Sequence, residues 1–327
     1  VRSPGEFKKG HLPNAVNLPL FEDHERAEIG TLYIRQSREK AIERGLELVG
    51  PKMVRFIRTV NQLKKSLKQE NPVIGVYCWR GGMRSNSMAW LLRLYGFRVC
   101  LLQGGYKAYR AGLPALLEQY DWKFILLGGL TGCGKTDVLN QMAAAGQQIL
   151  DLEGLANHRG SAFGHLGQED QPTTETFENR IHDRLRLFNP ANPVWIEAES
   201  QLIGSVHIPN LLFERMKKAP IYVYEIPLQQ RIERLCKEYG HFNKTELKEA
   251  FGKITKRLGV ERARIAMQMI DENKIAEAAE LALFYYDKSY SHSLKAQKND
   301  NAKKVILTVD DPEQAARILI TNLYANN

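Results

Sequence analysis

The clearest indication of the fold is the glycine-rich segment Gly129-Leu130-Thr131-Gly132-Cys133-Gly134-Lys135-Thr136. It follows an apolar run at 124–127 and precedes a pattern at 137–145 that predicts a helix. Strand, glycine loop, Lys-Thr and helix together predict a phosphate-binding loop, because glycines let successive backbone N–H groups converge on one anion. The helix dipole and the Lys135 ammonium add positive potential, and the Thr136 hydroxyl suits Mg²⁺. A glycine-rich turn that contains Lys-Thr by chance is the alternative.

Acidic residues follow two of the strands predicted after this loop. Helical stretches alternate with strand-like runs at 148–150, 194–196, 221–224 and 305–307. This alternation predicts a parallel sheet covered on both faces, and such sheets bind ligands at the carboxyl ends of their strands. Asp151 and Glu153 follow the first run, and Glu197 and Glu199 follow the second. We expect Glu197 and Thr136 to hold a Mg²⁺ ion, directly or through water. Helix caps or solvated acids are the alternative for these carboxylates.

Basic side chains are predicted near the same strand ends. A glycine-broken loop carries His158, Arg159 and Ser161, a set that suits gripping a phosphate or stacking a base. Arg231 and Arg234 lie one helical turn apart after the run at 221–224, where P-loop kinases often keep anion-binding arginines. Surface arginines without a ligand are the alternative.

The segment at about 240–300 reads as a basic helical subdomain. It contains Tyr285 and Tyr286 and a set of cations, Lys253, Lys256, Arg257, Arg262 and Arg264. A basic surface with exposed aromatic rings suits single-stranded RNA, whose bases stack on such rings. A solvated helical face with the tyrosines in the core is the alternative.

A second loop that is a candidate for reactivity lies upstream in the sequence and contains a cysteine. Cys78 ends a buried strand at 73–77, Arg80 and Arg84 flank it, and a helix is predicted at 86–95. Peptide N–H groups, the helix dipole and guanidinium charge favour thiolate over thiol. Such a cysteine could carry a sulfur-family atom or attack phosphorus. An inert buried cysteine is the alternative.

Length and composition favour a soluble protein of two domains. The 327 residues exceed one ordinary hydrophobic core. Four widely spaced cysteines form no C-x-x-C pair, which favours a reducing cytosol. No apolar run approaches the ~20 residues that cross a bilayer, so we expect a cytoplasmic protein without a membrane partner. The formal net charge of +9 favours a polyanionic partner, and nucleic acid is the first candidate.

The N-terminal part resembles a rhodanese domain. The resemblance rests on the Cys78 loop and on three further segments, 3–7, 10–15 and 102–109. It implies that Cys78 is a sulfur- or selenium-handling nucleophile. In such domains an aspartate and a first strand usually precede Val1-Arg2, and we expect that strand to be missing from this sequence. Cys78 and Arg84 are spaced as C-x₅-R, one residue longer than the usual sulfurtransferase loop and shared with rhodanese-like phosphatases.

Nearly the whole sequence is similar to the bacterial tRNA 2-selenouridine synthases. The similarity rests on both loops and on three shorter motifs, Leu-Glu-Gly-Leu-Ala (152–156), His-Arg-Gly-Ser (158–161) and Tyr-Tyr-Asp (285–287). It implies an α/β fold, with a rhodanese-like domain at 1–118 and a P-loop NTPase-like parallel-sheet domain at 119–327. A helical insertion lies toward the C-terminal half of the second domain.

The resemblance also implies a reaction and its partners. The wobble 2-thiouridine of tRNA attacks geranyl diphosphate, and selenium from selenophosphate then replaces the geranylthio group. We therefore expect geranyl diphosphate and selenophosphate as co-substrates, with Mg²⁺ but without a tightly bound cofactor. An enzyme that produces selenophosphate is a further partner to expect.

Three other functions stay open from the residues alone. The phosphate loop would equally serve an ATP-dependent kinase or ATPase acting on a nucleotide or RNA. The C-x₅-R loop would serve a phosphatase. A tRNA-binding module with an inactive site is the third alternative.

Overall fold

The computed structural model describes residues 1–67, 71–296, 303–308 and 310–324. The chain forms two compact units, Val1–Ala115 and Leu116–Asn327. Within the described residues, no helix combines the length and the apolar character that spanning a membrane requires.

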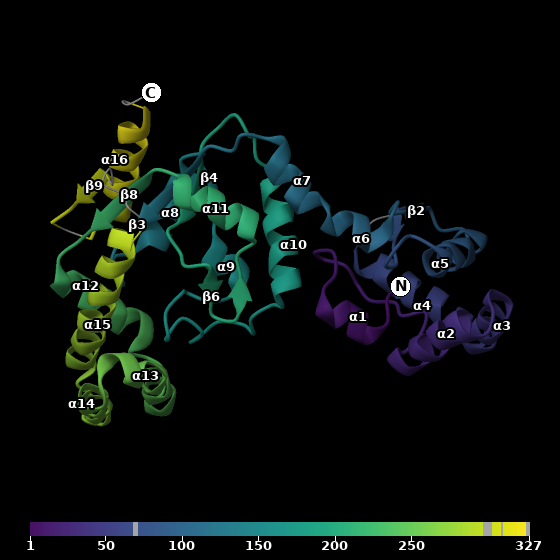
Figure 1. Cartoon of the computed structure of the whole chain (residues 1–327), viewed down its shortest axis with the longest axis horizontal. Helices are drawn as coiled ribbons and strands as arrows, with labels where there is room; N and C mark the ends of the chain where they lie inside the picture. Colours follow the sequence, from purple (N-terminus) through teal and green to yellow (C-terminus); the bar gives the residue numbers. More distant parts are fainter. Residues whose placement is uncertain (68–70, 297–302, 309, 325–327) are drawn as a thin grey trace. The chain divides into compact units, whose positions relative to one another are not determined.

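The first unit is an α/β domain built on a short parallel sheet (Figure 1). Its strands β1 (Ile74–Val76) and β2 (Val99–Leu101) pair in parallel. The helices are α1 (Pro4–Lys9), α2 (Asp23–Arg35), α3 (Arg38–Val49), α4 (Met53–Ser66), α5 (Met83–Leu94), α6 (Gly105–Arg110) and α7 (Gly112–Gln119), with a 3₁₀ turn at Gly50–Lys52. Helix α7 continues past Ala115 into the second unit.

The core of the first unit lies between α4, α5 and the sheet. Helix α4 turns Phe56, Ile57 and Val60 inward, at the spacing of one helical face, and they pack with Met88 and Leu92 of α5. Helix α5 begins at Met83, three residues before its predicted start, because the end of the Cys78 loop already has helical geometry. Arg84 and Ser85 therefore belong to the first turn of α5. Gly96, with φ of +101°, follows the end of this helix.

The second unit is a five-stranded parallel sheet with the order β4-β5-β3-β8-β9. Its strands are β3 (Phe124–Gly128), β4 (Gln148–Leu150), β5 (Val194–Glu197), β8 (Ile221–Glu225) and β9 (Lys303–Ile306), and β6 (Leu202–Ile203) and β7 (Val206–His207) form a separate antiparallel pair. The helices are α8 (Lys135–Ala144), α9 (Leu152–Ala156), α10 (Thr174–Leu185), α11 (Asn210–Lys218), α12 (Leu228–Tyr239), α13 (Lys244–Leu258), α14 (Val260–Asp271), α15 (Ile275–Ala296) and α16 (Pro312–Tyr324).

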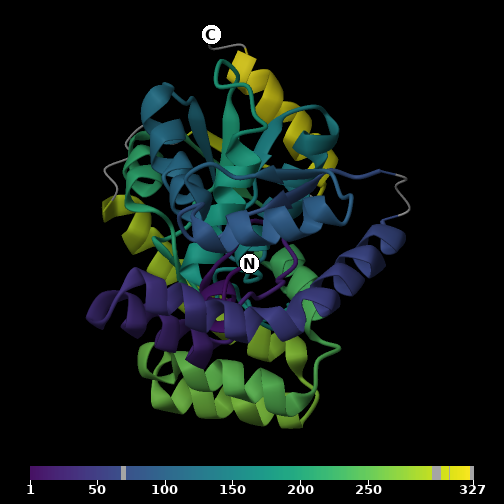
Figure 2. The same cartoon turned by 90° about the vertical axis from the view of Figure 1, so that its right-hand side faces the viewer.

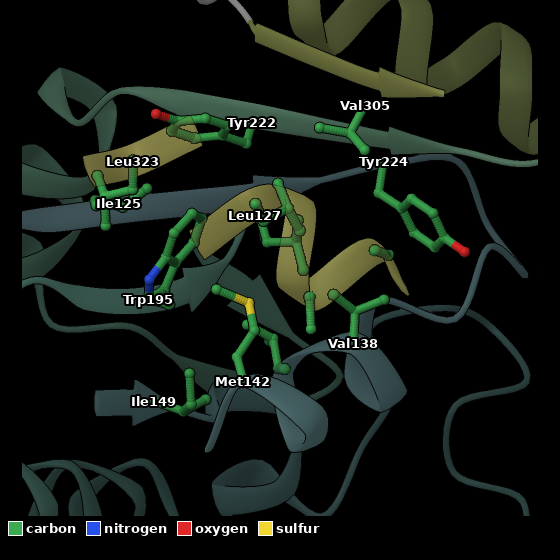
Figure 3. Close-up of a cluster of buried hydrophobic side chains, with 14 of the residues drawn as sticks. Ile125, Leu127, Val138, Met142, Ile149, Trp195, Tyr222, Tyr224, Val305 and Leu323 are labelled. Atoms are coloured by element: carbon green, nitrogen blue, oxygen red, sulfur yellow. The ribbon is translucent and has the colours of Figure 1, made fainter. Parts of the chain in front are cut away.

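Helices cover both faces of this sheet, as expected for buried parallel strands. Helices α8 and α16 pack together over one face, and α10 and α11 contact strands on the other side (Figure 1). Figure 3 shows Leu127 and Trp195 of the sheet beside Val138 and Met142 of α8, all of them buried. The fold thus confirms the α/β architecture of rhodanese-like and P-loop domains that the sequence predicts.

The helical insertion is formed by α13, α14 and α15. Helices α13 and α14, light green in Figure 2, lie side by side and pack on α15. Their small core includes Leu247, Phe251, Ile270 and Ala282. The insertion was predicted at about 240–300, and the last four of those positions, 297–300, lie outside the described residues.

We expect Gly105→Ala to destabilise the first unit by about 2 kcal/mol. Gly105 has φ of +61°, and a Cβ there would lie 2.4 Å from the amide nitrogen of Gly81 and 2.5 Å from the carbonyl oxygen of Cys78. Gly30→Ala is the matched control, because Gly30 is inside α2 with open space around it. Denaturant unfolding should show that the free energy of unfolding of the control rises by up to about 1 kcal/mol. Equal effects of the two substitutions would contradict the steric argument.

Candidate functional site

The phosphate loop lies between β3, the central strand, and α8. Gly129 has φ of +152°, and a Cβ there would lie 2.5 Å from the carbonyl oxygen of Tyr224 and 2.7 Å from Sγ of Cys133. Helix α8 starts at Lys135, two residues before its predicted start, with Gly134 as its N-cap. The loop therefore runs straight into the positive end of a helix dipole.

A large open cleft lies in front of this loop, with a volume of ≈ 990 Å³. Its lining contains most of the predicted site residues of the second unit, namely Gly129, Thr131, Gly132, Gly134, Lys135, Thr136, Asp151, Glu153, Arg159, Ser161, Glu199, Tyr285 and Tyr286. Cys133 is fully buried, and burial raises its pKa, so this thiol stays protonated beneath the loop. The structure thus brings residues from positions 129 to 286 of the sequence together around one space.

Carboxylates surround the loop lysine. Glu197 ends β5 and is fully buried, and the Thr136 hydroxyl donates a hydrogen bond of 2.8 Å to its Oε1. Burial first, and then the neighbouring carboxylates, raises the pKa of Glu197 to about 7 and also raises the pKa of Glu153. Burial raises the pKa of Glu199 as well. For Lys135, burial acts against the charge, but the neighbouring glutamates outweigh it and raise its pKa.

The residues around Glu197 fit a Mg²⁺ ion. Its Oε2 is buried and, in the part of the chain that the structure describes, accepts no hydrogen bond. Mg²⁺ prefers oxygen ligands and is usually held by one or two carboxylates together with substrate phosphates. Glu197 and Thr136 are the residues that would hold the ion beside the phosphate loop.

The two arginines of α12 have different partners. Arg231 is buried, its Nη atoms bind the Asp287 carboxylate at 2.6 and 2.9 Å, and its Nε donates to the carbonyl oxygen of Thr131. Its guanidinium therefore braces the phosphate loop and does not line the cleft, contrary to the predicted anion-binding role. Arg234 does line the cleft, where it forms ion pairs with Asp137 and Asp310.

The predicted loop at 158–161 is divided between core and cleft. His158 is buried, and burial lowers its pKa, which favours the neutral imidazole. Arg159 is exposed at the cleft and forms an ion pair with Glu238. The Tyr286 hydroxyl accepts a hydrogen bond of 3.1 Å from the amide of Ala162 and so fixes this loop to α15.

The Cys78 loop of the first unit joins β1 to α5. Cys78 is buried, and its Sγ lies 3.3 Å from Oγ of Ser85. Burial alone would raise the pKa of this thiol, but hydrogen bonds from the Ser85 hydroxyl and from the amides of Ser85, Arg80 and Gly82 outweigh it and lower the pKa. The loop therefore favours the thiolate that the sequence predicts.

The two arginines that flank Cys78 differ in their ion-pair partners. Arg84 forms an ion pair of 2.7 Å with Glu6. Arg80 is exposed, and no acidic partner for it exists among the residues that the structure describes. Sequence reasoning missed Glu6, because 78 positions separate it from Arg84 and no local pattern marks the pair.

Comparison with known proteins places both units in known families. The family described as "tRNA 2-selenouridine synthase AAA domain" matches residues 122–321, and the "Rhodanese-like domain" family matches residues 1–112. A protein of Psychromonas ingrahamii named tRNA 2-selenouridine synthase is 35% identical over 326 residues, covering 90% of this chain and 87% of the relative. Proteins of the same name from Pseudomonas fluorescens and Bordetella bronchiseptica are 38% and 34% identical, and the matches cover 85% and 96% of this chain and 79% and 91% of the relatives.

We expect Ser85→Ala to raise the pKa of Cys78, because the thiolate loses a hydrogen-bond donor. Thiolate absorbance near 240 nm, corrected with Cys78→Ala, measures this titration. The pKa of Cys78 is lower in the folded protein than in an unfolded chain, so thiolate formation stabilises the fold at pH values above the unfolded pKa. This stabilisation is lost as the pH falls through the lower pKa of the folded state. Ser87→Ala is the matched control, because Ser87 is exposed on the same helix. An unchanged titration in Ser85→Ala would contradict the assignment.

Proposed function

The chain belongs to the tRNA 2-selenouridine synthase family, and from this premise we propose that it is a transferase that modifies tRNA in two steps. Its substrate is tRNA with a wobble 2-thiouridine, and its co-substrates are geranyl diphosphate and selenophosphate. The observation that supports the proposal is that one chain has two glycine-containing loops at helix N-termini, one with a cysteine of lowered pKa and one with a lysine of raised pKa.

The first step transfers the geranyl group. The thiocarbonyl sulfur attacks C1 of geranyl diphosphate, the C1–O bond breaks, diphosphate leaves, and the ring loses its N3 proton. Lys135 and the amides of the phosphate loop support this step, since they face the cleft and can stabilise negative charge on the leaving group. Mg²⁺ held by Glu197 and Thr136 would add positive charge on the diphosphate oxygens. The phosphate loop thus acts without hydrolysing ATP.

The second step exchanges sulfur for selenium. Selenium of selenophosphate attacks C2 of the base, and geranylthiolate leaves. The Cys78 thiolate then attacks phosphorus, the P–Se bond breaks to give 2-selenouridine, and water hydrolyses the cysteinyl phosphate. The lowered pKa of Cys78 supports this role, because the thiolate is the nucleophilic form. The C-x₅-R loop suits a phosphate-sized group, and Arg80 supplies charge for it.

RNA as the substrate is supported by the charge and by the surface of the helical insertion. The chain has a net charge of +9. Phe284 on α15 is 56% exposed, and the Arg262 guanidinium lies 4.8 Å from its ring centroid. An exposed ring beside a cation is the pair on which unpaired bases stack. A selenophosphate-producing enzyme is the partner that the second step requires.

We expect Lys135→Ala to lower formation of S-geranyl-2-thiouridine by roughly 100-fold or more, because the leaving diphosphate loses its principal cation. The assay incubates the protein with 2-thiouridine tRNA and geranyl diphosphate and identifies the nucleosides by mass. Lys218→Ala, an exposed lysine of α11, is the matched control. Steady ATP hydrolysis without tRNA would instead support a kinase or ATPase.

We expect Cys78→Ala to stop the formation of 2-selenouridine when selenophosphate is added and to accumulate the Se-phosphorylated base, because phosphorus then lacks the nucleophile that breaks the P–Se bond. Cys100→Ala is the matched control, since Cys100 is exposed on β2. A Cys78→Ala protein that still made selenouridine would refute the role of Cys78. Hydrolysis of aryl phosphates that depends on Cys78 would favour the phosphatase alternative.

A further inference from the structure

An apolar cavity lies between the helical insertion and α12. Its lining comes from the phosphate loop, the loop after α9 and helices α12 to α15, and most of it consists of alanine, leucine, isoleucine and phenylalanine side chains. Ala278 and Ala282 are one turn apart on α15 and leave room that larger side chains would fill.

The cavity adjoins the cleft of the phosphate loop. Five residues line both spaces, Thr131, Ser161, Leu235, Tyr239 and Tyr286. Thr131 belongs to the phosphate loop itself. A ligand whose anionic end is bound by this loop can therefore extend its other end toward the cavity.

The lining chemistry decides which kind of group fits. All hydroxyl-bearing residues of the lining belong to the set shared with the cleft, so they stand at its boundary. The rest of the lining is aliphatic or phenylalanine. A nucleobase would leave the hydrogen-bonding groups of its edge without partners there, which is costly when they are buried. A hydrocarbon chain has no such groups and gains from leaving water.

We propose that this cavity binds the hydrocarbon chain of a prenyl diphosphate whose diphosphate is held by the phosphate loop. The inference rests on the proposed function and adds to it the residues that select the co-substrate. Apolar burial of the chain and charge on the diphosphate together distinguish this ligand from ATP, which carries the charge but not the chain. Residues of α15 then determine the accepted chain length.

The test compares two diphosphates that differ only in the chain. Calorimetry with the full-length protein, without tRNA, measures binding of geranyl diphosphate and of inorganic diphosphate. We expect geranyl diphosphate to bind at least tenfold more tightly. Ala282→Leu should remove most of that advantage and leave inorganic diphosphate within twofold, because the added side chain fills the cavity and not the loop. Dimethylallyl diphosphate, with its shorter chain, should be less affected.

Two further variants make the result decisive. Ala276→Leu is the matched control, because Ala276 is exposed on the same helix and lies outside the cavity lining. If Ala282→Leu fails to fold, Ala279→Leu, at a half-buried lining position, replaces it.

The outcomes separate this inference from the proposed function. Equal binding of the two diphosphates by the unmodified protein, or equal weakening of both by Ala282→Leu, overturns the cavity assignment. An Ala282→Leu protein that geranylates tRNA with an unchanged KM for geranyl diphosphate also overturns it, while the proposed function stands. A chain-dependent affinity that Ala282→Leu removes supports the cavity, even if no geranylated tRNA is formed and the proposed function fails.

Discussion

Parallel strands end along one edge of their sheet, and in the second unit this constraint brings a lysine and three glutamates together. Strand β3 leads into the phosphate loop, β5 ends at Glu197, and β4 leads to Glu153. Burial disfavours the charged carboxylates, while Lys135 favours them, so their protonation and the lysine charge depend on each other. An anionic ligand would enter a space where a cation is already held in place by its neighbours.

The two units share the same local geometry around their glycine-containing loops. In each, a strand runs into a glycine-containing loop, and the loop runs into the N-terminus of a helix, so that amides and a helix dipole point at one place. The side chain within the loop decides the chemistry. Cys78 carries a thiol whose thiolate form is favoured, whereas Lys135 carries an ammonium whose charge is favoured.

Much of this arrangement can be predicted from the sequence, because it depends on local patterns. The glycine loop, the alternation of strands and helices and the acids at the strand ends are all short-range signals, and the cleft contains Asp151, Glu153 and Glu199 as expected. Ion pairs between residues that are far apart in the sequence cannot be predicted in this way. The ion pair between Arg84 and Glu6 depends on tertiary packing, and no local pattern reveals it.

The apolar cavity was not predicted for a related reason. Its lining residues come from four helices and two loops, and each of them alone resembles an ordinary core position. The small residues of α15 could have drawn attention, but alanine is common in helices and carries no signal of an empty space.

The pairing of the buried Arg231 with Asp287 has an evolutionary consequence. It joins the carbonyl of Thr131 in the phosphate loop to α15, and losing Asp287 would deprive the buried Arg231 guanidinium of this carboxylate partner. Mutational drift at one position is therefore constrained by the other, and the two should vary together among homologues.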